Sequence, residues 1–428
     1  MIRARLATAF SRGYLHFFAS NLAQQVVAFV TVLAIARILP EAEFAVVRIA
    51  QAYLAVLLIV GAAGVTAPVL RYGAEPSLGS MEKRQLFGHA LKIALFASAL
   101  FMGAAWVVTL WRFPATSIDR AVFLGYAAQL PALAVFSVAV VYLQAVQQFQ
   151  KLAISQLCIK LLALFVLVGG AYFHGLQGLV VAALAMAMVS ALVMLRMAPP
   201  VFQRTRPPTI PHDFNSLARY SVFGMLLTTL GQSSDLILLD ALAVDKNAVG
   251  SYSLASVFFV AAGALVGTAQ SVATPMFTAL MGDPPQFRRQ LRQWSIGMFV
   301  AGVLVAATLI ACAWALKFWF FGERYADFPA LLTLLMAKFV LWSTYAIGGA
   351  AMLGIGAIKQ GSWIAAITTV LAFAAGVPLI WAYGVWGAAW AQVVVAVATF
   401  VLVWWVIRDE TRRLERRHQL ASSQGTEA

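Results

Sequence analysis

Long apolar runs separated by short polar connections recur along the whole chain. Most runs hold about twenty residues or more, the length a helix needs to cross about 30 Å of hydrocarbon. Only helices and closed barrels satisfy their backbone hydrogen bonds in lipid. Because these runs are uniformly apolar rather than alternating, they predict membrane-spanning helices and not barrel strands.

We predict an all-α, polytopic membrane protein of about twelve transmembrane helices, which places both termini on the same side. The first apolar run continues to Leu39, so we interpret it as a span and not as a cleaved leader. The predicted spans are residues 18–39, 44–70, 88–110, 121–147, 152–171, 175–197, 219–243, 250–280, 293–316, 327–354, 361–382 and 385–407.

The basic residues are distributed unequally between the two sets of connections. Of 30 lysines and arginines, 21 fall on the side that carries both tails and five on the opposite side. By the positive-inside rule, both termini should be cytoplasmic, and we expect a multi-pass protein of the bacterial inner membrane. The net charge of +14 therefore indicates orientation and contact with anionic lipids, chiefly through Arg408–Arg417, rather than nucleic-acid binding.

The composition excludes several kinds of site. Apolar residues make up 62% of the chain and charged residues 11%, too few to solubilise a globular protein of this length. Cys158 and Cys312 both lie in apolar runs, and the five histidines are scattered, so neither a disulfide framework nor a metal site is predicted. The loops contain no phosphate-cradling glycine pattern, and we expect no cofactor.

The longest connection, residues 199–216, is basic and rich in proline. It divides the chain into an N-terminal six-helix lobe, 1–198, and a C-terminal six-helix lobe, 217–407, followed by a basic tail, 408–428. Short segments repeat between the halves at a nearly constant offset, such as Val65–Pro68 and Val272–Pro275. An even number of spans in each repeat predicts two lobes in parallel orientation, related by an axis along the membrane normal.

Several segments resemble a known family of transporters. They are Leu33–Pro40 with Glu43 and Phe44, Val69–Glu75, Ser234–Leu239 and Val249–Ala255. Together they resemble the Wzx-type polysaccharide flippases of the multidrug/oligosaccharidyl-lipid/polysaccharide exporter superfamily. The resemblance implies two six-helix lobes around a central cavity, alternating access, and polyprenyl-pyrophosphate-linked oligosaccharides as substrates. It also implies glycosyltransferases and a polymerase of the same pathway as partners; we expect a monomer.

Four basic residues inside the predicted spans are candidates for binding an anionic substrate. A charge in a span costs roughly 2.5–3.5 kcal/mol on insertion scales, so each requires a compensating environment. Lys338 should lie near the midplane, facing a hydrated cavity, an anionic substrate or an acidic partner. Lys160 has Gln156 one turn before it. Arg48 and Arg37 lie near the outer ends of their spans, where a guanidinium could bind pyrophosphate oxygens or extend to the interface.

A polar stripe in the seventh span, with Gln232 and Asp235, has a counterpart at Gln24 in the first. Two such stripes facing one cavity would supply hydrogen bonds to sugar hydroxyls. Alternatively, Asp235 and Asp240 neutralise the arginines at the outer ends of the spans, or Asp235 binds a coupling ion.

These observations favour a flippase that moves a lipid-linked oligosaccharide from the cytoplasmic to the periplasmic leaflet. A cation-coupled drug antiporter of the same superfamily is the alternative, but it should carry buried acids in the first lobe, and spans one to six contain none. A membrane enzyme should carry a large catalytic loop, whereas no connection exceeds about twenty residues, so we predict that the chain is not an enzyme.

Overall fold

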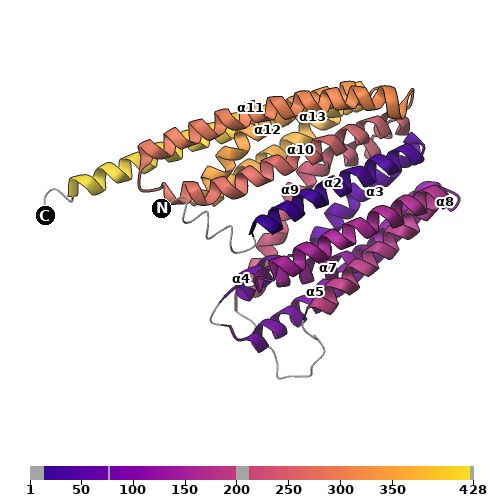
Figure 1. Ribbon diagram of the computed structural model, residues 1–428, viewed down its shortest axis with the longest axis horizontal. Helices are drawn as coiled ribbons and strands as arrows, with labels where there is room; N and C mark the ends of the chain where they lie inside the picture. Colours follow the sequence, from indigo (N-terminus) through magenta and orange to yellow (C-terminus); the bar gives the residue numbers. More distant parts are fainter. Residues whose placement is uncertain (1–13, 76–77, 199–211, 425–428) are drawn as a thin grey trace. The chain divides into compact units, whose positions relative to one another are not determined.

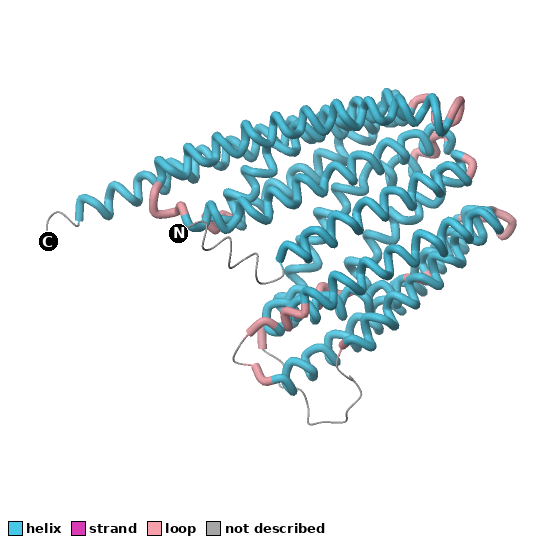
Figure 2. Tube along the Cα trace, in the orientation of Figure 1, coloured by secondary structure: helices cyan, strands magenta, loops and turns pink. Residues whose placement is uncertain are grey.

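The computed structural model describes residues 14–75, 78–198 and 212–424. Within these ranges the regular secondary structure is entirely helical (Figure 2). The predicted linker 199–216, the N-terminal basic residues and the last four residues lie wholly or partly outside them. The elements are α2 (Tyr14–Ile38), α3 (Glu41–Gly61), α4 (Thr66–Gly73), α5 (Ser80–Arg112), α6 (Ile118–Ala127), α7 (Leu130–Ala145), α8 (Phe149–Met197), α9 (Phe214–Ala241), α10 (Lys246–Ala279), α11 (Pro284–Leu316), the π-helix η1 (Lys317–Phe321), α12 (Phe328–Gly354) and α13 (Ile358–Gln424).

Nine helical stretches in the described residues are long and apolar enough to cross a membrane, and Leu22–Ile38 is a shorter apolar helix. Four strongly exposed aromatic side chains lie near helix ends or turns: Trp111, Tyr172, Trp319 and Trp381. All four lie beside turns that the charge distribution places on the outer side, where aromatic residues favour the membrane interface. The chain is a multi-pass, all-helical membrane protein.

Two of the nine stretches are helical hairpins and not single rods. In α8 the regular geometry breaks at His174 and Gly175, and a Cβ on Gly178 would meet the carbonyl oxygen of Gly170. Residues eight apart lie about 12 Å from each other in a straight helix, so this contact requires the chain to reverse. The backbone of Gly175 (φ 58°, ψ −140°) lies in a region that side chains other than glycine's rarely allow.

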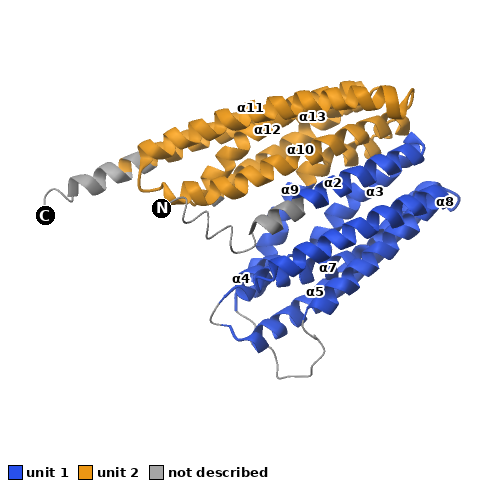
Figure 3. Ribbon diagram, in the orientation of Figure 1, with its two compact units in different colours: residues 1–229 blue, residues 230–428 orange. Residues whose placement is uncertain are grey.

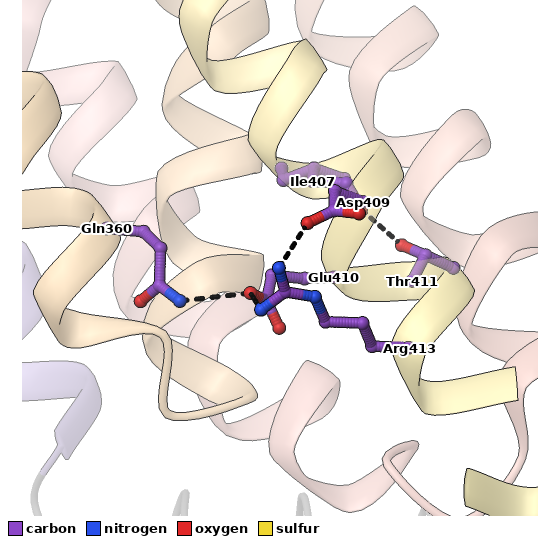
Figure 4. Close-up of polar contacts among 6 residues, drawn as sticks. All are labelled: Gln360, Ile407, Asp409, Glu410, Thr411 and Arg413. Atoms are coloured by element: carbon purple, nitrogen blue, oxygen red, sulfur yellow. Dashed lines mark hydrogen bonds and ion pairs between the residues drawn. The ribbon is translucent and has the colours of Figure 1, made fainter. Parts of the chain in front are cut away.

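The second hairpin lies in α13, where Gly384 has φ 57° and ψ −130°. Gln360 and Glu410 would be about 75 Å apart in a continuous helix, yet Gln360 Nε2 donates to Glu410 Oε1 at 2.9 Å. Figure 4 shows this contact beside Arg413, which pairs with Asp409 at 2.8 Å and Glu410 at 3.1 Å. Both reversals fall where two predicted spans meet, while the total of twelve crossings stays a prediction.

One predicted span is wrong in that it is interrupted. The span predicted at 44–70 is divided into α3 and α4, because Ala63 and Gly64 adopt positive φ values of 48° and 63°. A Cβ on Gly64 would collide with the carbonyl oxygen of Ala218 on α9, so the close approach requires glycine. The span predicted at 121–147 agrees with one apolar stretch, Ile118–Ala145, in which a short turn separates α6 from α7 and Pro131 lies in the first turn of α7.

The contacts divide the chain into two compact units, residues 1–229 and residues 230–428 (Figure 3). The division falls within α9, later than the predicted linker. The prediction of two parallel six-helix lobes therefore stays a prediction.

In unit 1, α8 packs against α2 and α7, and α7 also contacts α4 and α5. Figure 1 shows α5, α7 and α8 running side by side. The core joins α5, α7, α8 and the start of α9, with Phe87, Val138, Met194 and Phe214 among its buried members. Apolar residues on facing helices thus form the frame that holds the polar residues described below.

In unit 2, α12 is the central helix and contacts α10, α11 and α13 (Figure 1). Its buried face includes Leu331, Leu335, Phe339 and Ile347. The neighbouring helices begin at side-chain caps: Asp245 accepts from the backbone N–H of Ala248 in α10, and Asp283 does the same for α11. Such caps satisfy amide groups that the first turn of a helix leaves unpaired.

Candidate functional site

A cavity of about 410 Å³ lies within unit 1, where α2, α3, α6, α7 and α8 meet. Its wall is mixed, with apolar residues such as Leu54, Phe136 and Met186 between polar ones. The polar lining consists of Gln24, Arg48, Gln51, Tyr126, Gln129, Gln156, Lys160 and Ser190. The part of the lining that the structure describes contains two cations and no carboxylate.

Arg48 is positioned on α3 by neighbouring amide and phenol groups. Its Nη1 donates to Oε1 of Gln51 at 2.8 Å, and Nε2 of Gln51 donates to the hydroxyl of Tyr126 at 3.4 Å. Tyr126, on α6, is 4% exposed. These contacts hold the guanidinium at the cavity wall through an uncharged amide.

Lys160 enters the cavity from α8, with Gln156 one helical turn earlier on the same wall. The side chain of Lys160 has accessible surface and lines the cavity. Lys160 lies about 16 Å along α8 from Phe149, and Arg48 about 10 Å along α3 from Glu41. Both cations therefore lie two or three turns from the start of helical stretches that are long and apolar enough to cross a membrane.

The cavity's electrostatics favour an anion that also carries hydroxyl groups. An isolated charge in a low-dielectric environment is costly unless water or a counter-charge compensates it. A guanidinium binds phosphate oxygens in a bidentate manner, and an ammonium binds them as a point charge. The amides of Gln24, Gln51, Gln129 and Gln156 present both donors and acceptors, as sugar hydroxyls do.

A second buried polar group lies in unit 2 around Lys338. Its Nζ donates to Oε1 of Gln392 on α13 at 2.5 Å and lies 4.4 Å from the centre of the Phe259 ring. Asp235 acts electrostatically on this ammonium. These contacts give Lys338 partners within unit 2, an amide and an aromatic face, with the carboxylate of Asp235 acting on it from a longer distance.

Asp235 links α9 to α10 in the same unit. Its Oδ2 accepts a 2.5 Å hydrogen bond from the hydroxyl of Tyr252, which is fully buried, and its Oδ1 accepts from the backbone N–H of Leu236. Asp235 and Gln392 also line a cavity of about 10 Å³. That volume is close to the room one water needs, and a phosphate or sugar does not fit. We name Asp235, Tyr252, Phe259, Lys338 and Gln392 the unit-2 network.

The structure brings three of the seven predicted site residues into one cavity: Gln24, Arg48 and Lys160. Lys338 and Asp235 belong to the unit-2 network instead. Arg37 is an exposed residue at the end of α2, and Gln232 is exposed on α9; neither lines the unit-1 cavity.

Sequence reasoning missed several residues of both groups. In unit 1 these are Gln51, Tyr126 and Gln129, and in unit 2 Tyr252 and Gln392. Gln51 is three residues after Arg48, so a search for amides at helical spacing from each intramembrane cation would have found it. No local sequence pattern marks Gln392, because its partner Lys338 lies 54 positions earlier in the chain.

Comparisons with known proteins agree on the fold. The profile of a family described as "Polysaccharide biosynthesis protein" matches residues 10–281. An inward-facing multidrug resistance MATE family transporter of the MOP superfamily has a TM-score of 0.73 at 14% identity, covering 92% of this chain and 96% of that one.

The lipid II flippase MurJ in an inward closed conformation also has a TM-score of 0.73, at 11% identity, covering 95% of this chain and 91% of that one. A MOP superfamily transporter from Pyrococcus furiosus has a TM-score of 0.65 at 14% identity, covering 95% of this chain and 96% of that one. A search of curated protein sequences finds no significant match. At these identities the structural similarity establishes the fold alone.

Proposed function

Because the chain belongs to the polysaccharide biosynthesis protein family and shares the fold of MOP superfamily transporters, we propose that it flips a lipid-linked oligosaccharide across the membrane. The substrate would carry a polyprenyl pyrophosphate and pass from the cytoplasmic to the periplasmic leaflet of a bacterial inner membrane. The chain would work by alternating access, without enzymatic chemistry.

The unit-1 cavity is the observation that carries this proposal. It combines Arg48 and Lys160 with four glutamine side chains in a wall whose described residues include no acid. The two cations would bind the pyrophosphate, and the amides would bind the first sugar. The polyprenyl tail, being apolar, would remain in lipid.

The residues that line the unit-1 cavity support the alternative function, a cation-coupled antiporter, less well. Binding a cationic drug or a coupling cation in this cavity would require a carboxylate to offset its charge. Among the residues described in unit 2, Asp235 could bind a cation, but it is already engaged by Tyr252 and lies near Lys338. Fixed positive charge in the unit-1 cavity repels a cationic cargo.

The unit-2 network would then hold α9, α10, α12 and α13 together while the transporter changes conformation. In this proposal Lys338 is a positioning residue that supports the helices, and Arg48 and Lys160 contact the substrate. Arg37 and Gln232, exposed as they are, would act only if another conformation turned them toward the substrate.

Surface polysaccharide display tests the proposal in cells whose only functional copy of this gene is a plasmid-borne variant. R48Q/K160Q should reduce display at least about tenfold at normal protein level, because each charge-assisted hydrogen bond contributes roughly 1.5–3 kcal/mol. Lipid-linked oligosaccharide should accumulate in the cytoplasmic leaflet.

The matched control is K151Q, which removes a lysine from the exposed start of the same helix, outside the cavity. It should display polysaccharide as the unaltered chain does. Normal display by R48Q/K160Q would remove the cavity from the mechanism. If deleting the gene left surface polysaccharide intact but increased drug sensitivity, the antiporter would be the better description.

A further inference from the structure

A groove of about 960 Å³ runs along the start of α11 in unit 2, apart from the unit-2 network. Three arginines occupy the first turns of α11, and apolar residues follow. The described lining consists of Arg288, Arg289, Leu291, Arg292, Gln293, Ser295, Ile296, Phe299, Thr344 and Trp404, with no acidic residue among them. We name this set the α11 groove.

The three arginines are unfavourable for the helix that carries them. Arg292 lies one turn from both Arg288 and Arg289, and like charges at this spacing destabilise a helix. All three side chains are exposed. A bound anion would relieve the mutual repulsion of the three guanidinium groups.

The groove changes from basic to apolar along the helix axis. Ile296 and Phe299 continue the strip of Arg289 and Arg292 at helical spacing and are 53% and 48% exposed. Phe299 lies about 10 Å further along α11 than Arg292. Charge at one end and exposed apolar surface at the other match an amphiphile that lies parallel to the helix.

Trp404, on α13, supplies a second polar feature of the wall. Its indole Nε1–H is buried and finds no acceptor within the described part of the chain. A buried donor without an acceptor costs about 1–3 kcal/mol. A phosphate or ester oxygen of a bound lipid would provide that acceptor once the indole turns toward the groove.

We propose that the α11 groove binds an anionic phospholipid of the cytoplasmic leaflet, with its phosphate on the arginines and an acyl chain along Ile296 and Phe299. The charge distribution places this end of α11 on the cytoplasmic side, where anionic lipids attract basic residues. The site is distinct from the unit-1 cavity, and the proposal does not depend on the identity of the transported substrate.

Native mass spectrometry of the purified full-length chain tests this site with phosphatidylglycerol and phosphatidylcholine of identical acyl chains. The unaltered protein should retain phosphatidylglycerol preferentially. R289Q/R292Q should weaken that binding roughly tenfold or more, since each basic residue at a lipid surface contributes about 1 kcal/mol. W404F keeps an aromatic side chain but replaces the indole by a smaller ring without the N–H donor, and should weaken binding to a smaller extent.

R84Q/R219Q is the matched control, because it removes two exposed arginines, one on α5 and one on α9, that lie outside the α11 groove. This control should bind phosphatidylglycerol as the unaltered chain does. Equal losses in both double variants would overturn the proposal, since they would indicate general surface attraction. Unchanged binding by R289Q/R292Q would also overturn it.

Glycerol 3-phosphate separates a lipid site from a site for soluble phosphate. It should fail to displace phosphatidylglycerol at equal concentration because it lacks the acyl chain. Displacement would overturn the lipid assignment and indicate a soluble phosphate ligand. Thermal unfolding of each variant, measured without added lipid, distinguishes lost binding from lost folding. If R289Q/R292Q is unstable, the binding of phosphatidylglycerol by W404F tests the groove in its place.

Discussion

The ammonium of Lys338 donates to Gln392 and lies over the ring of Phe259, so methionine at this position removes charge while keeping chain length. K338M would leave the Gln392 oxygen without its donor and Asp235 without its cationic neighbour. We expect a loss of about 1–3 kcal/mol in the free energy of unfolding, measured as a lower midpoint of thermal unfolding. K338R should lose less, because it retains the charge.

The control for Lys338 is Lys359→Met, which changes an exposed lysine of the same unit and should leave the unfolding midpoint nearly unaltered. A K338M protein of normal stability that no longer supports polysaccharide display would contradict the positioning role. That result would instead assign Lys338 to direct substrate binding.

The hydroxyl of Tyr252 makes a 2.5 Å hydrogen bond to Asp235 inside unit 2. Y252F removes the hydroxyl and leaves the phenyl ring in place. It should therefore destabilise the chain by about 1.5–3 kcal/mol, as expected for the loss of a hydrogen bond to a charged group. Y220F, at a tyrosine of α9 that is 77% exposed, should cost less than about 0.5 kcal/mol. Equal midpoints for the two variants would show that the bond contributes no net stability.

Side-chain roles could be predicted from the sequence only in part. The sequence gives the depth of a charged residue in a span, and depth alone selected Arg48, Lys160 and Lys338 as intramembrane cations. It does not give the direction a side chain faces or its partner on a distant helix. Gln392 lies 54 positions from Lys338, so the contact that satisfies this lysine depends on tertiary packing.

The reversals within α8 and α13 depend on close backbone contact between their two arms. A Cβ on Gly387 would collide with the carbonyl oxygen of Leu379 across the α13 turn. G387A should therefore separate the arms and destabilise unit 2 by about 1–3 kcal/mol or more, seen as a lower unfolding midpoint.

G297A is the contrasting change, because a Cβ at that glycine of α11 meets no atom within 4 Å. Alanine favours a helix over glycine by about 0.5–1 kcal/mol, so this variant should unfold at the same temperature or higher. A G387A protein that matched G297A in stability would show that the two arms are not in close contact at this turn.

Helix positions could be predicted largely from hydropathy, and helix interruptions could not. The hairpin turns at Gly175 and Gly384 fall between runs that the sequence already separates. The break between α3 and α4 was missed because the residues around Ala63 and Gly64 are as apolar as the spans they divide. The contact that favours this break lies on α9, at Ala218, and no local pattern reports it.

At the scale of the whole molecule, the excess of basic residues in alternate connections predicts which turns face the cytoplasm. The membrane class follows from the sequence, since apolar runs of span length allow few other folds. The family follows from the short segments that resemble known flippases, and the family match confirms it. Orientation is a separate property, set by charge and not by packing, and it can be measured directly on the intact membrane.

Single cysteines in a C158S/C312S background test the orientation with a membrane-impermeant maleimide. Ser117→Cys, in the connection between α5 and α6, should be labelled in intact cells because that connection is predicted to be periplasmic. Ser80→Cys, at the start of α5 among the basic residues Lys83 and Arg84, should be labelled only after the membrane is opened. The opposite pattern would invert the topology. It would also place the arginines of the α11 groove at the outer leaflet, so the same measurement bears on which lipids that groove can meet.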